Sequence, residues 1–300
     1  MLHNDKELFE QVILKVAEST GIDVGIIEKD YYVTLFLKKI VELQPNIIFK
    51  GGTSLSKCYK LINRFSEDID LNIDTESKPT EGQRKKLKEN IVSIINKLGF
   101  TLDNLDNVKS RRNYNRYVID YPTVFSSEYL KEHLIVETAV YIKAYPCKRM
   151  SATSIIYDYL NNNGYDDLIA QYGLEPFELN VQTAERTLID KLYALGDYYL
   201  SDSVHEHSRH IYDIYKLLDI VSLNDNLKCL ANEVYQERKP HEQCRSAKNE
   251  VDMNMLLREI IDKDIYKKDY EDITEKLLFE DVKYDVAIDA LKKVVDYNLF

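Results

Sequence analysis

Apolar residues in the N-terminal half of the chain follow first a helical spacing and then a strand spacing. Two helices are expected at the start, an amphipathic one over residues 4–20 and a second from Asp23, as its N-cap, to about Glu42. The later patterns predict helices at 53–61 and 80–98 and strands at 47–49, 68–73, 117–121 and 133–142. This mixture predicts an α/β arrangement for the N-terminal half.

From Thr183 onward, the spaced Leu, Ile and Val residues have helical periodicity almost throughout. A boundary is therefore expected near Pro176 to Asn180. The fold class predicted is α+β, with a mixed-sheet domain over residues 1–178 and a helical bundle over 179–300.

Composition narrows the possible functions. The chain has 300 residues, 44% of them hydrophobic, which is enough for a real core. Its net charge of -11 argues against a generally basic nucleic-acid binder, although a local basic groove is compatible with it. Four scattered cysteines, none in CxxC spacing, predict neither a zinc nor a redox motif and fit a cytoplasmic protein. No apolar stretch is long enough for a membrane span, so no membrane partner is expected.

Two carboxylates alternate along the strand expected at 68–73. Residues i and i+2 of a strand point to one face, so Asp68 and Asp70 aim their oxygens at the same place. Two convergent carboxylates can hold Mg²⁺, which keeps open positions for phosphate oxygens. The alternative is an acidic, solvated strand edge, because Asp is mostly exposed in proteins.

A glycine pair separates the strand at 47–49 from the helix expected after it. Gly51 and Gly52 let a ligand approach the backbone closely, and the N–H groups of a helix N-terminus favour phosphate. Further nucleotide contacts are expected from the side chains of Lys50, Thr53, Ser54 and Lys57. The alternative is a plain strand-to-helix turn with a capping threonine.

A glycine turn followed some sixteen residues later by an Asp-x-Asp strand resembles the polymerase-β-like nucleotidyltransferase fold. Within that group, the chain is similar to the AbiEii/AbiGii-type nucleotidyltransferase toxins of bacterial toxin–antitoxin and phage-defence systems. The similarity rests on the blocks Glu28–Tyr31, Lys50–Lys57, Arg64–Leu71, Glu185–Leu192 and Ser208–Ile214. These blocks span most of residues 28–220, and the last 80 residues match only as a helical tail.

The resemblance implies roles for individual residues. Gly52 with Thr53 or Ser54 would hold the triphosphate of an NTP, and Asp68 and Asp70 would hold Mg²⁺. Lys191 would be the lysine of the third family motif and Asp213 the aspartate of the fourth. Ser66 has the position at which some relatives are phosphorylated, and it is included among the nucleotide-binding candidates. Lys191 is then expected to lie near the acidic pair.

Three of these residues have structural alternatives. Lys191 lies beside an apolar stripe and could simply extend its ammonium to solvent. Asp213 could pair with Arg209 one turn earlier on a helix; as a functional residue, it could orient Lys191 or act as a general base. Glu137 is the candidate for a third metal carboxylate on a neighbouring strand, and its alternative is an outward-facing edge residue.

The function predicted is a Mg²⁺-dependent nucleotidyltransferase toxin. The resemblance implies transfer of nucleotides from an NTP to an acceptor, expected to be the 3′ end of a tRNA, which would block translation. It also implies a cognate antitoxin protein as a partner. Basic clusters with interleaved tyrosines could contact RNA, or could be solvated surface: Arg84–Lys86, Arg111 to Arg116, Lys143 to Arg149, with Tyr114, Tyr117 and Tyr145.

The alternative function is a non-catalytic NTP-binding regulatory module. A glycosyltransferase would leave Gly51, Gly52 and Lys191 unexplained.

Overall fold

The chain divides into two compact units, described here from a computed structural model that covers residues 1–66, 68–75, 78–125 and 133–300. Unit 1 consists of Met1–Cys58, Glu67–Lys143 and Cys147–Val181, and unit 2 of Tyr59–Ser66, Ala144–Pro146 and Gln182–Phe300. Unit 2 thus takes in two short segments from the N-terminal half of the sequence. Glu67, part of the Arg64–Leu71 motif, lies outside the described residues.

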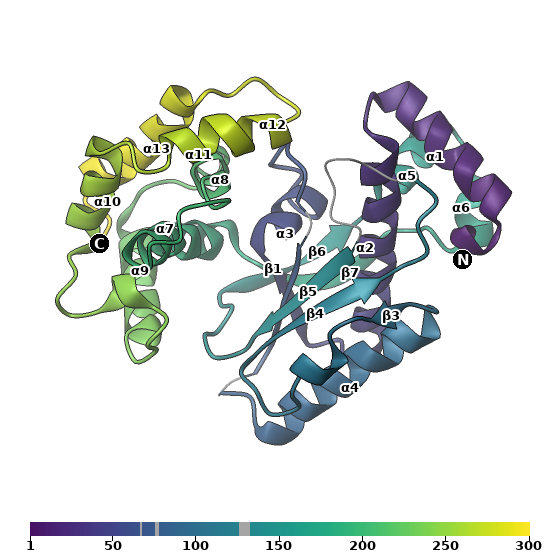
Figure 1. Cartoon of the computed structure of the whole chain (residues 1–300), viewed down its shortest axis with the longest axis horizontal. Helices are drawn as coiled ribbons and strands as arrows, with labels where there is room; N and C mark the ends of the chain where they lie inside the picture. Colours follow the sequence, from purple (N-terminus) through teal and green to yellow (C-terminus); the bar gives the residue numbers. More distant parts are fainter. Residues whose placement is uncertain (67, 76–77, 126–132) are drawn as a thin grey trace. The chain divides into compact units, whose positions relative to one another are not determined.

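Unit 1 contains a mixed sheet with helices packed around it (Figure 1). Its strands are β1 (Ile47–Lys50), β2 (Asp68–Ile73), β3 (Thr101–Leu102), β4 (Tyr114–Asp120), β5 (His133–Ala139), β6 (Cys147–Ala152) and β7 (Phe177–Gln182). Its helices are η1 (Leu2–Asn4), α1 (Lys6–Thr20), α2 (Val24–Leu43), α3 (Gly51–Lys57), α4 (Glu81–Lys97), η2 (Leu105–Asn107), α5 (Ile155–Asn162) and α6 (Asp166–Tyr172).

Among the described residues, the sheet has seven strands in the order β3-β4-β5-β2-β1-β7-β6. Strand β1 is antiparallel to β2 and parallel to β7, and β2 is parallel to β5, which is antiparallel to β4. Strand β1 lies between β2 and β7, and its apolar residues Ile47–Phe49 are all buried, so both of its faces are covered. The sheet therefore places the Asp68–Asp70 strand directly beside the strand that leads into Gly51.

The predicted helices at the N-terminus are confirmed, with the capping expected for the second. The Asp23 carboxylate accepts hydrogen bonds from the Gly25 and Ile26 amides at the start of α2. Thr80 and Gln83 form a reciprocal capping box at the start of α4. Helix α2 packs against α1, α4 and α5, which explains why so many of its residues are buried.

Several predicted boundaries differ from the structure, among them the ends of the strands predicted at 117–121 and 133–142, which are Tyr114–Asp120 and His133–Ala139. Helix α3 begins at Gly51 rather than Thr53 and ends at Lys57. The boundary expected at 176–180 falls inside strand β7, which pairs with β1 through Asn180 and Val181. The alternation of Leu179 and Val181 with polar residues is the strand signal that the sequence reading missed.

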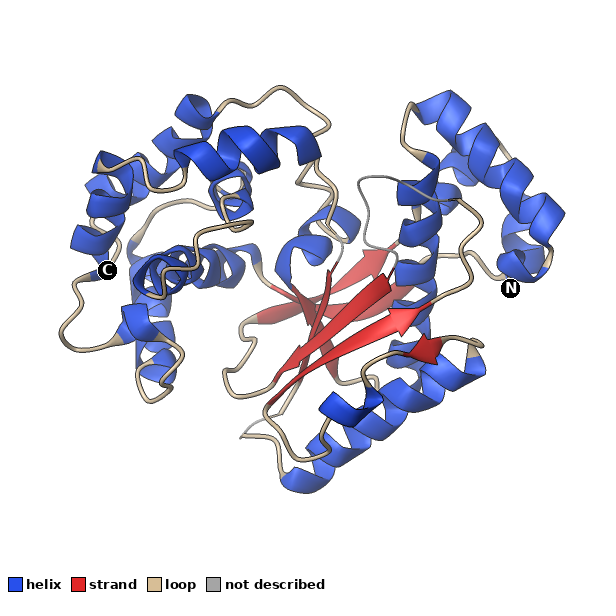
Figure 2. Ribbon diagram, in the orientation of Figure 1, coloured by secondary structure: helices blue, strands red, loops and turns tan. Residues whose placement is uncertain are grey.

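Unit 2 is built from helices, and Figure 2 shows this for the segment that follows β7. They are α7 (Ala184–Leu200), α8 (Arg209–Leu217), α9 (Asp225–Arg238), η3 (Arg245–Ala247), α10 (Met253–Asp262), α11 (Lys267–Asp269), η4 (Tyr270–Thr274), α12 (Glu275–Leu277) and α13 (Tyr284–Tyr297). Helix α7 packs against α8, α9, α10 and η3, and α13 packs against α8 and α10. The helical periodicity predicted from Thr183 onward is thus found in the structure.

Candidate functional site

The turn between β1 and α3 lies directly against the Asp70 carboxylate. Gly51 has φ +76°, a conformation that side chains with a Cβ rarely adopt. A Cβ at Gly51 would lie 2.0 Å from Asp70 Oδ2 and 2.8 Å from its Cγ. The pairing of Lys50 with Asp70 across β1 and β2 produces this close approach. Glycine is therefore required at position 51 for two independent reasons, its backbone angle and its neighbour.

Asp68 and Asp70 share one face of β2. Both are half-buried, whereas Ile69 and Leu71, which alternate with them, are completely buried. The Thr53 hydroxyl donates to the backbone carbonyl of Asp68 over 2.6 Å and ties α3 to the start of this strand. The strand period thus directs both carboxylates to the same side of the sheet, as the sequence predicted.

Four charged residues on neighbouring strands form a row across the sheet. The register pairs Lys50 with Asp70, Asp70 with Glu137, and Glu137 with Arg116. Lys50 Nζ lies 4.0 Å from Asp70 Oδ1, and Arg116 Nε lies 3.5 Å from Glu137 Oε1. Burial raises the pKa of Glu137, and the charges of Asp70 and Asp68 raise it further. Glu137 therefore belongs to the electrostatic surroundings of the acidic pair.

The three predicted metal carboxylates are not assembled as a three-ligand site. Among the residues that the structure describes, no group of three or more His, Cys, Asp or Glu side chains is placed to hold a metal ion. Glu137 pairs with Arg116 instead, so its proposed place as a third ligand is not supported. Asp68 and Asp70 remain a suitable donor set, because Mg²⁺ is commonly held by one or two carboxylates together with substrate phosphates.

Two of the hydroxyl candidates around the turn, those of Thr53 and Ser54, donate hydrogen bonds to backbone carbonyls. The buried Ser54 hydroxyl donates to the Gly51 carbonyl over 2.8 Å, as the Thr53 hydroxyl does to Asp68. Ser66 lies half-buried in the connection before β2. The Thr53 and Ser54 hydroxyls hold the turn in place, whatever else they contact.

Lys57 is directed into the interior of unit 1. Its ammonium donates to Asp30 Oδ1 and to the Thr34 hydroxyl, each over 2.6 Å, and its side chain is only 4% exposed. Both partners are on α2. The nucleotide-binding role predicted for Lys57 is therefore corrected to that of a buried ion pair that fixes α3 to α2.

Lys191 and Asp213 meet in unit 2. Asp213, on α8, is fully buried, and its Oδ2 accepts from Lys191 Nζ of α7 over 2.5 Å. Arg64 donates to the same carboxylate through Nε and Nη2, each over 2.7 Å. Asp213 is thus bound to these two cations rather than serving a surface pair with Arg209. Sequence reasoning did not select Arg64 as a site residue, although it opens the Arg64–Leu71 motif.

The protonation of this cluster favours one of the two roles considered for Asp213. Burial alone would raise the pKa of Asp213, but the charges of Arg64 and Lys191 outweigh it and hold that pKa well below its usual range. A carboxylate stabilised in this way is a poor proton acceptor. The structure therefore favours Asp213 as the residue that orients Lys191 over Asp213 as a general base.

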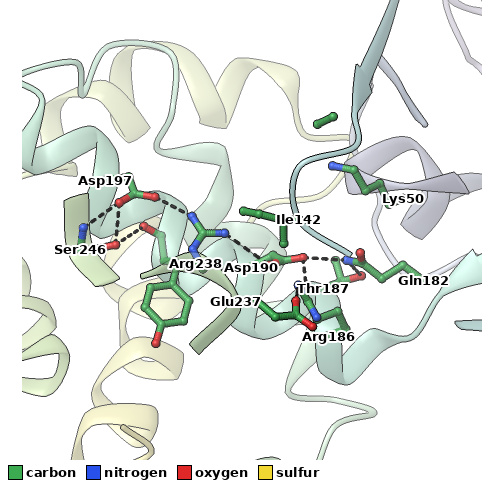
Figure 3. A network of polar contacts seen from close by, with 12 residues as sticks. Lys50, Ile142, Gln182, Arg186, Thr187, Asp190, Asp197, Glu237, Arg238 and Ser246 are labelled. Atoms are coloured by element: carbon green, nitrogen blue, oxygen red, sulfur yellow. Dashed lines mark hydrogen bonds and ion pairs between the residues drawn. The ribbon is translucent and has the colours of Figure 1, made fainter. Parts of the chain in front are cut away.

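The motif Glu185–Leu192 serves a second, separate network on α7 (Figure 3). The side chain of Asp190 accepts from Gln182 over 3.1 Å and from Arg186 over 3.3 Å. Arg186, 1% exposed, also donates to Glu237 of α9 over 2.9 Å. Arg238 extends the network from Asp190 to Asp197, which accepts from Ser246. These residues hold α7 to its neighbours, whereas Lys191 contacts Asp213.

The two sets of predicted residues belong to different units. Asp68, Asp70 and the glycine turn are in unit 1, and Lys191 and Asp213 are in unit 2. The expectation that Lys191 lies near the acidic pair stays a prediction. Of the tyrosines considered for RNA stacking, Tyr117 is buried in the core at 1% exposure, which removes it from that set, whereas Tyr114 is 44% exposed.

Within the described residues, no helix is long and apolar enough to cross a membrane.

Comparisons with known proteins identify the family. No curated protein matches the chain. The nucleotidyltransferase toxin MenT4 of Mycobacterium tuberculosis H37Rv is similar in structure, with 16% identity and a TM-score of 0.49 over 96% of this chain and 97% of that chain. The family model for the nucleotidyl transferase AbiEii toxin of type IV toxin–antitoxin systems matches residues 35–293. Because this match covers most of the sequence, the chain belongs to the AbiEii nucleotidyltransferase toxin family.

Proposed function

We propose that this protein transfers a nucleotide from an NTP to an RNA acceptor, with Asp68 and Asp70 holding Mg²⁺ beside the Gly51–Gly52 turn. The observation that carries this proposal is the close approach of the Gly51 backbone to the Asp70 carboxylate. A ligand bound by the carboxylates can also reach the glycine backbone, because no side chain intervenes. Membership of a nucleotidyltransferase family supports this reading of the geometry.

The residues around the turn have distinct tasks in this proposal. Mg²⁺, when bound, would neutralise charge on the phosphates. Gly51 and Gly52 would contact the triphosphate through their backbone, and Lys50 would add a positive charge next to Asp70. Thr53 and Ser54 would keep the turn in its conformation through their bonds to Asp68 and Gly51. Glu137 would contribute negative charge from the neighbouring strand.

Lys191 and Asp213 are proposed to act in the same reaction. Lys191 would contact phosphate charge that develops during transfer, and Asp213 would hold its ammonium in place. The support is that the family match extends over both units and that a lysine this deeply buried is held by a fully buried carboxylate. Burying a lysine together with its counterion has a desolvation cost, which is more readily explained if the lysine has a task.

The acceptor proposed is the 3′ end of a tRNA, so that transfer would block translation in the cytoplasm. The family description, a toxin of type IV toxin–antitoxin systems, supports an action on a central cellular process and implies a cognate antitoxin. Tyr114, exposed on β4, and Arg116 on the same strand are two of the candidates in unit 1 for contact with RNA.

The direct test is transfer of label from each of the four NTPs, radiolabelled at the α-phosphate, to total RNA with Mg²⁺ present. Labelled tRNA is expected with at least one nucleotide. Asp70→Ala should abolish transfer and remain folded, because Asp70 is half-buried. The matched control is Asp74→Asn, which alters a carboxylate just after the same strand, and it should remain active.

Two results would count against the proposal. Retained transfer in the Asp70→Ala variant would refute the metal assignment. Calorimetric binding of an NTP by the wild-type protein, with no transfer to any RNA, would favour the non-catalytic regulatory module instead.

A further inference from the structure

A buried cluster in unit 2 joins three residues that are far apart in the sequence. Arg64 lies in the connection after α3, Lys191 on α7 and Asp213 on α8, and each is at most 6% exposed. Arg64 engages both oxygens of Asp213, with Nε on Oδ1 and Nη2 on Oδ2. Lys191 Nζ binds Oδ2. One carboxylate therefore has two cationic partners inside the protein.

The bidentate contact with Arg64 restricts the orientation of the Asp213 carboxylate. Two parallel N–H···O bonds from a planar guanidinium fix the plane of a carboxylate as well as its position. With both oxygens held, Asp213 offers Oδ2 to Lys191 from one direction only. One cation is enough to neutralise the buried charge of Asp213. The second cation therefore does more than neutralise that charge, because it also fixes the orientation of the carboxylate.

The backbone around Arg64 is anchored independently of its side chain. Arg64 forms a β-bridge with Leu278, and the flanking amides of Phe65 and Phe279 donate to Leu277 and Asn63. The starting point of the Arg64 side chain is therefore fixed by main-chain hydrogen bonds. A substitution of the side chain leaves these bonds available to hold the segment.

Lys191 has an unusual charge environment. Arg64, Arg209 and Asp213 act on it electrostatically, and its Nζ lies 3.5 Å from His210 Nδ1. Burial lowers the pKa of Lys191, Asp213 raises it, and the positive charge of Arg64 lowers it again. Burial also holds the pKa of His210 well below its ordinary value, so its ring is neutral at pH 7. The pKa of Lys191 therefore depends on the charge of Arg64, and this pKa can be measured.

We propose that Arg64 is a positioning residue, which fixes the Asp213 carboxylate so that the carboxylate in turn fixes the Lys191 ammonium. This inference rests on the proposed function, in which Lys191 contacts phosphate. Arg64 itself touches Asp213 and the Phe65 carbonyl. The proposed effect on transfer is the one that passes through its two bonds to Asp213.

The test compares Arg64→Gln and Arg64→Lys with the matched control Arg238→Gln. Arg238 is also a buried arginine of unit 2, but it binds Asp190 and Asp197. Two readouts are needed. One is kcat and KM for the NTP, and the other is the pKa of Lys191, followed by NMR in protein labelled with [6-¹³C]lysine and assigned with Lys191→Arg.

Arg64→Gln is expected to lower kcat about 100-fold, the scale of a small misplacement of a catalytic group. KM for the NTP should change by about threefold at most, because Lys191 is still present. The pKa of Lys191 should rise, since a neighbouring positive charge is lost. Arg64→Lys, which restores the charge without the planar fork, should recover part of kcat. Arg238→Gln should lower the melting temperature and leave kcat and the pKa of Lys191 unchanged.

A merely structural role predicts different results. Arg64→Gln would then resemble Arg238→Gln, with a lower melting temperature but with normal kcat and an unchanged pKa of Lys191, and this outcome would overturn the inference. If Arg64→Gln does not fold, Arg64→Lys carries the kcat comparison with Arg238→Gln: a kcat below that of the wild type supports the inference, and a normal kcat overturns it. A wild-type protein without transfer activity would overturn the proposed function, while the NMR titration would still decide whether Arg64 acts on Lys191.

Discussion

Replacing Gly51 with alanine tests the contact on which the proposed active site depends. The substitution has two separable costs. The positive φ of +76° strains any residue with a Cβ by about 1–2 kcal/mol. The new Cβ would also lie 2.0 Å from Asp70 Oδ2, which forces the carboxylate to move and adds about 1 kcal/mol, the lower end for overpacking beside a half-buried side chain.

Gly21 provides a matched control for the backbone term. It is also in unit 1, its φ is +72°, and a Cβ placed there meets nothing within 4 Å. Gly21→Ala should therefore show the strain alone. Urea denaturation followed by circular dichroism should give a larger loss of unfolding free energy for Gly51→Ala than for Gly21→Ala. Nucleotide transfer should fall sharply only in Gly51→Ala, because only there is Asp70 displaced.

A double-mutant cycle identifies the origin of the difference. Asp70→Ala removes the Oδ2 and Cγ atoms that a Cβ at position 51 would meet, and leaves only the Asp70 Cβ at 3.1 Å. In that background, the extra cost of Gly51→Ala should largely disappear. Equal losses for Gly51→Ala and Gly21→Ala, with no coupling to position 70, would refute the close approach and the proposal built on it.

Two further predictions concern buried charge in unit 1. Burial, together with the charge of the N-terminus, lowers the pKa of His3 to about 4, so the unfolded chain binds more protons below pH 6.5 and stability falls as the pH drops from 6.5 toward 4. The loss at pH 5 should be about 2 kcal/mol in urea titrations and should shrink in His3→Gln. Lys57→Met should cost about 3–5 kcal/mol by leaving the Asp30 carboxylate without its cation. Removing the exposed Lys39–Glu42 pair by Lys39→Met should cost no more than about 1 kcal/mol of unfolding free energy. Equal costs for Lys57→Met and Lys39→Met would contradict the burial of the Lys57–Asp30 pair.

Much of the local structure followed from short-range patterns. Asp23 and Thr80 begin their helices because a side-chain oxygen can satisfy amides that the helix leaves unpaired. Asp68 and Asp70 share a face because side chains alternate along any strand. The family resemblance rested on short motif blocks such as Lys50–Lys57 and Arg64–Leu71, and it is confirmed by the family match over residues 35–293.

Strand β7 shows where short-range reading was insufficient. Its residues alternate as a strand requires, but the boundary predicted at Pro176 to Asn180 covers its first four residues, because the chain becomes helical soon afterwards. Its pairing with β1 joins residues about 130 positions apart, and such pairing depends on how the whole sheet closes. The mixture of helices with a mixed sheet could be predicted, whereas the last strands of the sheet could not.

The partners of charged side chains were decided by tertiary structure alone. The sequence offers Lys57 as a positive charge near the glycine turn, yet the fold directs it to Asp30 on α2. Arg64 and Asp213, 149 positions apart, meet because the segment after α3 belongs to the helical unit. Residue type and local periodicity determine which chemistry a side chain can perform and which face it occupies. Which opposite charge it meets depends on long-range packing, since a buried ion must find its counterion wherever the chain brings one.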